Sequence, residues 1–324
     1  MIQLSDHFDY KRLLRYTLPS IIMLVFTSVY SVVDGFFVSN FVGKTPFAAV
    51  NLIMPVLMIL GCIGFMFGTG GSALIAKTLG EGKSQKARET FTLIVWVSAV
   101  CGLVLAVAGI ALLRPVAMLL GAREQLLEDC ILYGRVILLA LPFFILQFEF
   151  QCLFATAGKP RLGLGITAAA GLTNMALDAL FVAVLSWGLA GAAAATAFSQ
   201  LVGGLIPLIY FGRENTSLLR FVKCRFDGNV LWKTCSNGAS ELMGNISMSL
   251  VSMLYNLQLM KYAGADGIAA YGVLMYLSMI FQAIFMGYSV GVAPVVGYHY
   301  GAQNHGELKN LLRRSLLLVG AFFF

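Results

Sequence analysis

The amino-acid sequence predicts an all-α, multi-pass integral membrane protein built from two parallel repeats of six helices, the second of them incomplete. Three observations support this fold class. First, the 324 residues are 59% hydrophobic and 11% charged, whereas soluble domains are about 45–50% apolar and about 25% charged. Second, apolar stretches of membrane-spanning length follow one another along the chain. Third, an internal similarity relates the beginning of the chain to its last third.

Nine apolar stretches are long enough to cross a bilayer as helices, which requires about 20 residues each. They cover residues 16–38, 46–76, 90–113, 131–156, 161–185, 188–211, 231–260, 267–297 and 308–324. The last stretch is still apolar at Phe324, without a polar tail. We therefore expect the intact protein to continue beyond this point with further helices of the second repeat.

Lysine and arginine are distributed unevenly over the segments that connect these stretches. Seventeen of the 22 basic residues lie in the N-terminal segment or in the even-numbered connections, and 5 lie on the opposite side. Because basic residues accumulate in cytoplasmic loops, the pattern predicts a cytoplasmic N-terminus and a cytoplasmic 212–230 connection. The net charge of +7 is explained in this way without a nucleic-acid partner.

The internal similarity appears when the chain is shifted by 221 residues. Residues 43–80 then align without gaps with residues 264–301, with nine identities that include Gly70 with Gly291 and Gly80 with Gly301. Six predicted helices separate equivalent positions, so both copies have the same orientation. Parallel repeats of this kind form two bundles related by an axis along the membrane normal, with a cavity between them. We assign residues 1–215 to the first bundle, 216–230 to a cytoplasmic linker and 231–324 to the start of the second bundle.

Four acidic residues fall inside the predicted spans, namely Asp34, Glu149, Asp178 and Glu241. An acidic side chain at the centre of a membrane helix is unfavourable by about 3 kcal/mol on insertion scales, so such residues face protein or water and commonly serve function. The alternative for each is a neutral, hydrogen-bonded carboxylic acid that only holds helices together. Glu149 and Glu241 are candidates for binding cationic substrate or relaying protons.

Helix geometry brings two of these acids to one level of the membrane. At 1.5 Å per residue, Asp34 lies about 9 Å and Asp178 about 10 Å from the outer ends of their spans, and Thr196 lies about 13 Å deep. Asn174 precedes Asp178 by one turn on the same helix face. Two carboxyl groups at low dielectric cannot easily both be ionised, and oxygen ligands suit a hard cation such as Na⁺. We therefore predict a site for Na⁺ or a proton; a static hydrogen-bond network is the alternative.

Several ordered motifs resemble those of the MATE (multidrug and toxic compound extrusion) family. They include "LPSIIMLVFTSVYSVVDGFFVSNFVG" in the first span, "TNMALDALFV" in the fifth and "GLAGAAAATAFSQ" in the sixth. The resemblance covers the whole chain. It implies a twelve-helix fold of two six-helix lobes, and a bacterial type of transporter in the cytoplasmic membrane. It also implies a coupling-ion site at Asp34, Asn174, Asp178 and Thr196, with Tyr30 beside it. The charge-free sequence "GNISMSLVS" departs from family members that carry a second acidic site, so Glu241 is not assigned to one.

Together these patterns predict a secondary antiporter that exports organic, mainly cationic compounds in exchange for Na⁺ or H⁺. We expect a monomer that contacts lipids and small-molecule substrates and needs no cofactor besides the coupling ion. A flippase for lipid-linked oligosaccharides is the alternative transporter, although its anionic substrates favour a cationic cavity. An enzyme is disfavoured because the spans contain no metal-binding or nucleophile–base motif. A chain that is inactive without its remaining helices is the third alternative.

Overall fold

The computed structural model describes residues 3–321, except the side chains of Ser39, Lys44 and many residues between 252 and 277. The described backbone is helical and contains no β-strand. Its helices are α1 (Tyr10–Phe37), α2 (Lys44–Gly61), α3 (Ile63–Gly80), α4 (Ser84–Leu119), α5 (Glu124–Thr156), α6 (Pro160–Asp178), α7 (Gly188–Gly212), α8 (Gly228–Gly301) and α9 (His305–Ala321). Two π-helices, η1 (Val38–Val42) and η2 (Ala179–Val184), continue α1 and α6. Within the described residues, seven helical segments are long and apolar enough to cross a membrane, which confirms the predicted fold class.

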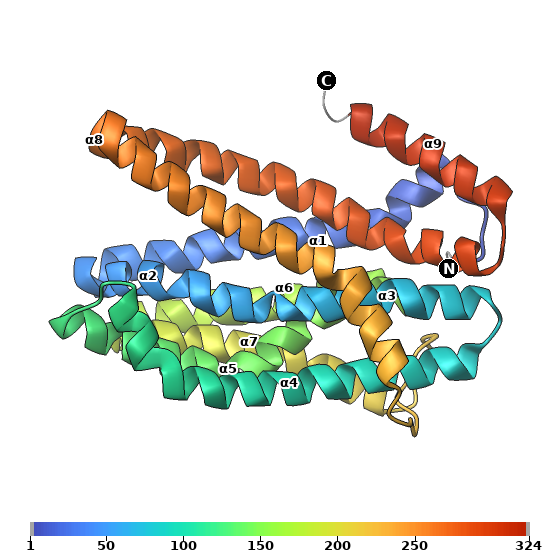
Figure 1. The fold of residues 1–324 in the computed structure, drawn as a ribbon, viewed down its shortest axis with the longest axis horizontal. Coiled ribbons are helices and arrows are strands. Elements are labelled where there is room, and N and C mark those ends of the chain that lie inside the picture. Colours follow the sequence, from blue (N-terminus) through green and yellow to red (C-terminus); the bar gives the residue numbers. More distant parts are fainter. Residues whose placement is uncertain (1–2, 322–324) are drawn as a thin grey trace.

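The helices α1 to α7 run along the long axis of the molecule, and α3 continues α2 in line (Figure 1). α5 is the most buried of them and packs against α2, α3, α4 and α7. Its side chains are buried without interruption from Phe144 to Thr156. A helix that is apolar on all sides is expected at the centre of a bundle. α5 therefore forms the scaffold against which the outer helices are placed.

Four predicted spans differ from the observed helices. The stretch 46–76 is interrupted at Cys62, where α2 ends and α3 begins. The stretches 231–260 and 267–297 belong to one helical segment, α8, whose ribbon forms two arms that meet at one end of the molecule (Figure 1). The stretch 308–324 corresponds to α9, which is 17 residues long and is not among the seven candidate spans; residues 322–324 lie outside the described part.

The two arms of α8 pack closely on α3 and α1 because glycines stand at the crossings. Gly238 on the first arm approaches the backbone of Met66 on α3 so closely that a Cβ atom would collide with its carbonyl oxygen. On the second arm, Gly291 lies against Thr17 on α1, where an added Cβ atom would come within 3.0 Å of the Thr17 Cα. Small residues permit such contacts between membrane helices, where dispersion forces replace the hydrophobic effect. The crossings therefore fix α8 against the first six spans.

The segment between α7 and α8 is not helical and folds back onto the first bundle. Leu218 N–H donates to the carbonyl of Ala157, and Val222 N–H donates to Thr92 Oγ1. The Phe221 ring stacks on Phe91 at a centroid distance of 5.3 Å. These contacts attach the predicted linker 216–230 to the bundle over much of its length.

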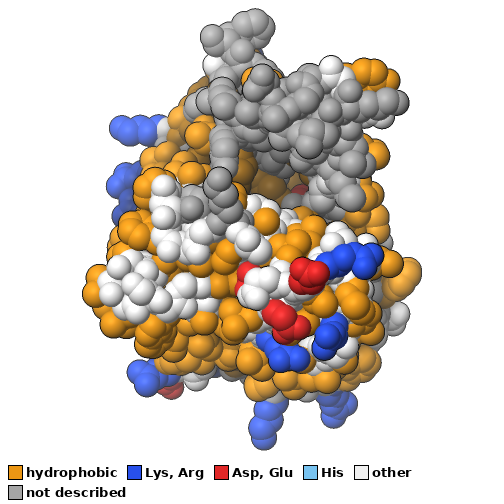
Figure 2. Space-filling model, turned by 90° about the vertical axis from the view of Figure 1, so that its left-hand side faces the viewer, with side chains coloured by type: hydrophobic (Ala, Val, Ile, Leu, Met, Phe, Trp, Pro, Cys, Tyr) orange, Lys and Arg blue, Asp and Glu red, His pale blue; other side chains and the backbone are white. Residues whose placement is uncertain are grey.

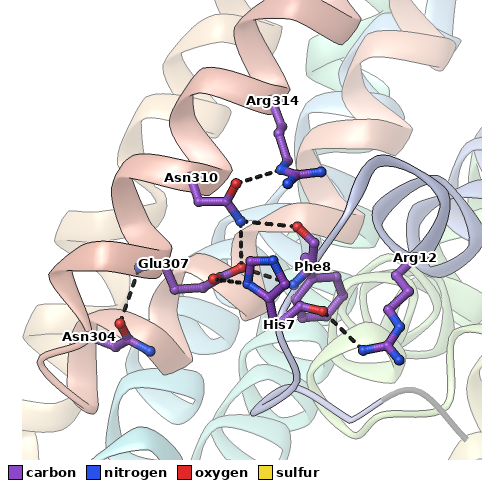
Figure 3. A network of polar contacts seen from close by, with 7 residues as sticks. All are labelled: His7, Phe8, Arg12, Asn304, Glu307, Asn310 and Arg314. Carbon is purple, nitrogen blue, oxygen red and sulfur yellow. Dashed lines mark hydrogen bonds and ion pairs between the residues drawn. The ribbon is translucent and has the colours of Figure 1, made fainter.

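The N-terminal segment before α1 connects the beginning of the described chain to α9 (Figure 3). Glu307 accepts hydrogen bonds from Phe8 N–H at 2.9 Å and pairs with His7 Nδ1 at 2.6 Å. Asn310 Nδ2 donates to the Phe8 carbonyl at 3.0 Å. Phe8 itself is fully buried and packs edge-on against Tyr16. The first and last described helices are thus tied together at one end of the molecule.

The opposite end holds the α1–α2 and α4–α5 connections. Seen from this end, hydrophobic side chains cover most of the visible surface and charged side chains gather in a few places (Figure 2). Exposed large hydrophobic residues also line the flanks of the bundle, including Val100, Leu103, Val104 and Val107 on α4. An exposed apolar belt of this kind is expected where lipid tails surround the protein.

Candidate functional site

The two acidic residues predicted to share a site stand at equivalent places in their helices. Asp34 lies in the last turn of α1, and Asp178 is the last residue of α6. Directly after these turns, both helices change to π-helical geometry in η1 and η2, and these two segments contact each other. Short π-helical segments within α-helices occur frequently at functional sites. The π-helical segments therefore lie directly beside the two acidic residues, at the same candidate site.

A hydrogen bond joins α1 to α7 at this level. Thr196 Oγ1 donates to Asp34 Oδ1 at 3.4 Å, a long bond at the limit of normal geometry. The Asp34 side chain is almost fully buried, with an exposed fraction of 9%. The predicted proximity of Asp34 and Thr196, which are 162 residues apart in the sequence, is therefore observed.

Asp178 lies within electrostatic reach of Asp34. It is completely buried, yet neither of its carboxyl oxygens has a hydrogen-bond partner of normal geometry among the described residues. The side-chain carbonyl oxygen of the buried Asn174 is also without a partner there. Buried polar atoms without partners are rare in folded proteins and call for a bound species or a proton. The two carboxyl oxygens of Asp178 and the side-chain oxygen of Asn174 are therefore available to a bound cation or a proton.

A small cavity of about 110 Å³ lies at this level of the bundle. Tyr30, Asp34, Asn174 and Thr196 line it, whereas Asp178 is not part of the lining. Among the described residues no group of three or more histidine, cysteine or acidic side chains is placed to hold a metal ion. Hydroxyl, carboxyl and carboxamide oxygens are ligands for a hard cation such as Na⁺, so the oxygens of the lining are chemically suited to a singly charged hard cation or a proton.

Three polar residues of this site were not predicted. Gln147 on α5 and Gln200 on α7 line the cavity. Tyr133 on α5 is buried, and its hydroxyl lies within reach of Thr196 and both acidic groups. A tyrosine or glutamine inside an apolar span gives little signal in a single sequence, because such residues often bury their apolar part and satisfy the rest locally.

The remaining two predicted residues lie apart from this cavity. Glu149 is fully buried on α5 and accepts a hydrogen bond from Ser98 Oγ on α4, while its second carboxyl oxygen has no partner among the described residues. Glu241 on α8 is partly exposed. Both glutamates lie within electrostatic reach of Cys152 on α5. The structure thus places them near one another and on the opposite face of α5 from Gln147.

Comparisons with known proteins agree on a single family. The MatE family model matches residues 19–180 and 242–324. A multidrug export protein, MepA of Staphylococcus haemolyticus, is 27% identical over 97% of this chain and 69% of its own length. The MepA of Staphylococcus aureus strain MRSA252 is 26% identical over the same shares.

Solved structures show the same fold. A MATE transporter crystallised in the straight conformation superposes with a TM-score of 0.90 at 22% identity and covers 96% of this chain and 70% of its own. A multidrug resistance MATE family transporter of the MOP superfamily in an outward-facing conformation also superposes with a TM-score of 0.90 at 22% identity, covering 96% and 70%. At this level of identity, the structural similarity establishes the arrangement of the helices.

Proposed function

Because the chain belongs to the MatE family of multidrug efflux transporters, whose members are transporters and not enzymes, we propose that it works as a secondary antiporter. It exports organic cations in exchange for Na⁺ or H⁺ bound between α1, α6 and α7. The observation that carries this proposal is the buried pair Asp34 and Asp178, of which Asp178 has two carboxyl oxygens without hydrogen-bond partners among the described residues. Tyr30, Asn174 and Thr196 complete the site.

Coupling follows from the charge of this site. With the site empty, two carboxylates at low dielectric repel each other; a bound cation or proton removes that repulsion. The hydrogen bond from Thr196 to Asp34 links α7 to α1, and α7 also contacts η1, which continues α1; a change of charge at Asp34 therefore acts on this link. Since η1 and η2 adjoin the two acids and contact each other, a change at the acids alters the outer ends of α1 and α6 together. Ion binding therefore reshapes the outer half of the bundle and lowers its affinity for substrate.

The proposed substrates are organic cations. The curated relatives are named multidrug export proteins, and the cavity of the ion site is lined, besides Asp34, by aromatic and apolar side chains such as Phe144 and Phe148. A carboxylate beside aromatic faces attracts a positively charged, apolar compound by charge and by cation–π contact. Binding of the coupling ion and of a cationic substrate at neighbouring carboxylates is then mutually unfavourable, which is the requirement for exchange.

Orientation follows from the charge distribution. The end that carries Lys11, Arg12, Arg15, Lys159 and Arg161 holds most of the basic residues and faces the cytoplasm. The ion site then lies in the outer half of the membrane, in the bacterial cytoplasmic membrane, and the protein acts as a monomer surrounded by lipid. Glu149 and Glu241 lie in the inner half, where they attract cationic substrate or relay protons.

Reconstituted vesicles test the exchange directly. Purified protein is inserted into liposomes, and efflux of ethidium is followed while a Na⁺ gradient and a pH gradient are imposed separately. We expect one gradient to drive ethidium movement and its dissipation to stop it. Ethidium movement that is the same with either gradient, with both and with neither would contradict antiport.

A further inference from the structure

A second and larger cavity lies where α1 and α6 begin, at the end of the molecule opposite the ion site. It has a volume of about 620 Å³. Five basic side chains line it, from Lys11, Arg12 and Arg15 on α1 and from Lys159 and Arg161 at the start of α6. Asp6 and Asp9 are the acidic residues among the described lining. The cavity therefore collects more positive than negative charge.

The two acidic residues do not neutralise the basic ones. Asp9 accepts a hydrogen bond from the backbone N–H of Arg12 at 2.7 Å and so caps α1. Asp6 accepts one from the backbone N–H of Gln3 at 3.0 Å. His7–Glu307 and Lys83–Glu81 are ion pairs of the described residues, and neither contains Arg15 or Arg161. The positive charge of Arg15 and Arg161 is thus left for solvent or a ligand.

The start of α6 adds to the attraction for an anion. Lys159 occupies the N-cap position, Pro160 begins the helix, and no side chain caps its N-terminus. Pro160 has no N–H, and the N–H groups of Leu162 and Gly163 donate to the carbonyl of Lys159, so this end attracts an anion through the partial positive charge of the helix dipole. Lys159 Nζ donates to Thr216 Oγ1 at 3.0 Å, which holds this ammonium group at the rim.

An apolar track leads from the cavity along α1. Leu18 and Ile22 lie three and seven residues after Arg15, on the same helix face, and their exposed fractions are 49% and 45%. Tyr16, Pro19 and Leu162 form apolar parts of the cavity wall. A ligand that has both an anionic head and a long apolar tail fits this arrangement, whereas a free phosphate ion would leave the track uncovered.

We propose that this cavity binds the phosphate headgroup of an anionic phospholipid, with an acyl chain along Leu18 and Ile22. Given the proposed orientation of the chain, the lipid comes from the inner leaflet, whose anionic headgroups attract basic residues by about 1 kcal/mol each. Bound there, the lipid bridges the beginnings of α1 and α6, the two helices that carry the acidic residues of the ion site. The ion site itself is not required for this binding.

Lipid binding to the purified full chain tests the proposal. The detergent-solubilised protein is titrated with phosphatidylglycerol, with phosphatidylcholine and with inorganic phosphate, and bound lipid is counted by native mass spectrometry. We expect phosphatidylglycerol to bind more tightly than phosphatidylcholine, and Arg15→Gln/Arg161→Gln to weaken it about tenfold or more. Both arginines are exposed, so the substitutions leave folding intact; size-exclusion elution and the single variant Arg161→Gln check this.

A matched control is available in another basic cavity, of about 360 Å³, lined by Lys86, Lys223 and Arg225. Lys86→Gln/Lys223→Gln removes the same charge from the same end of the molecule, and we expect it to retain wild-type affinity for phosphatidylglycerol. If this control variant loses as much affinity for phosphatidylglycerol as the arginine variant, general surface charge explains the binding and the proposal is overturned. Inorganic phosphate that displaces the lipid at equal concentration would also overturn it, since the track along α1 would then contribute nothing. The experiment measures lipid binding and not ethidium transport, so its result does not depend on the proposed exchange mechanism.

Discussion

Gly80 and Gly301 each stand against a carbonyl oxygen of the other's helix. A Cβ atom on Gly80 would collide with the carbonyl of Tyr298, and one on Gly301 would collide with the carbonyl of Lys77. The shift of 221 residues that aligns the internal repeats relates Gly80 to Gly301 and Lys77 to Tyr298. The contact is therefore symmetric about a local two-fold axis between the copies, as in an isologous interface. The crossing of Gly70 with Gly238 and that of Gly291 with Thr17 obey the same relation.

The first prediction follows from this crossing. Gly80→Ala and Gly301→Ala each force a backbone carbonyl to move, and overpacking of this kind destabilises proteins by about 1–3 kcal/mol. We expect both variants to melt at a lower temperature than wild type in detergent. Gly244→Ala is the control, because a Cβ atom there meets nothing within 4 Å and alanine favours the helix by up to about 1 kcal/mol. Equal melting temperatures for all three variants would argue against the close crossing.

The hydroxyl of Thr196 is expected to tune the affinity for the coupling ion. Thr196→Ala removes the donor to Asp34 Oδ1, and the loss of a hydrogen bond worth about 0.5–1.5 kcal/mol changes the ion concentration for half-maximal efflux about three- to tenfold. Thr196→Ser keeps the hydroxyl and should restore the wild-type value. The dependence of drug efflux on ion concentration is measured for both variants. If Thr196→Ser is as impaired as Thr196→Ala, the effect comes from packing and not from the hydroxyl.

The hydroxyl of Tyr133 is expected to affect coupling but not stability. It is buried without a hydrogen-bond partner of normal geometry among the described residues, so Tyr133→Phe removes a poorly satisfied group and keeps the ring packing. We predict an unchanged or slightly raised melting temperature together with an altered ion dependence of efflux. Tyr210→Phe, on the partly buried Tyr210 beside Phe211, is the control and should change neither quantity.

Much of this site could be predicted because depth along a helix can be counted from its ends. Asp34, Asn174, Asp178 and Thr196 carry strong signals, since polar residues are rare in apolar spans. The π-helical turns could not be predicted, because they depend on how α1 and α6 pack on their neighbours. Tyr133 was not predicted either, since its hydroxyl reaches the site only through the packing of α5.

In the fold, too, some features could be predicted from the sequence and others could not. Periodicity and length gave the number of apolar stretches, and the identities at Gly70 and Gly80 indicated the repeat. The interruption at Cys62 was not predicted, because the stretch 46–76 is apolar on both sides of Cys62. The two arms of α8 follow the stretches 231–260 and 267–297, but the continuous helical backbone between them was not predicted.

The N-terminal contact with α9 should weaken in acid. Burial raises the pKa of Glu307, but hydrogen bonds from Phe8 N–H, His7 and Asn310 outweigh it and lower the pKa below its usual value. A carboxyl group with a lowered pKa stabilises the fold above its ordinary pKa of about 4.3 and loses this contribution as the pH falls through the lowered value. Wild type should therefore melt above Glu307→Gln at pH 7, by the equivalent of about 1–3 kcal/mol. The difference should shrink below about pH 4; a difference that is constant with pH would contradict the assignment.

The central claim is that Asp34 and Asp178 take up and release the coupling ion, and the most direct measurement is gradient-driven ethidium efflux by their asparagine variants. Asp34→Asn and Asp178→Asn retain the size and hydrogen-bonding capacity of the side chains but remove the exchangeable charge. We predict that both variants reach the membrane at wild-type levels and lose gradient-driven efflux, while Glu128→Gln, at an exposed position on α5, retains it. Wild-type efflux in both asparagine variants would contradict the account.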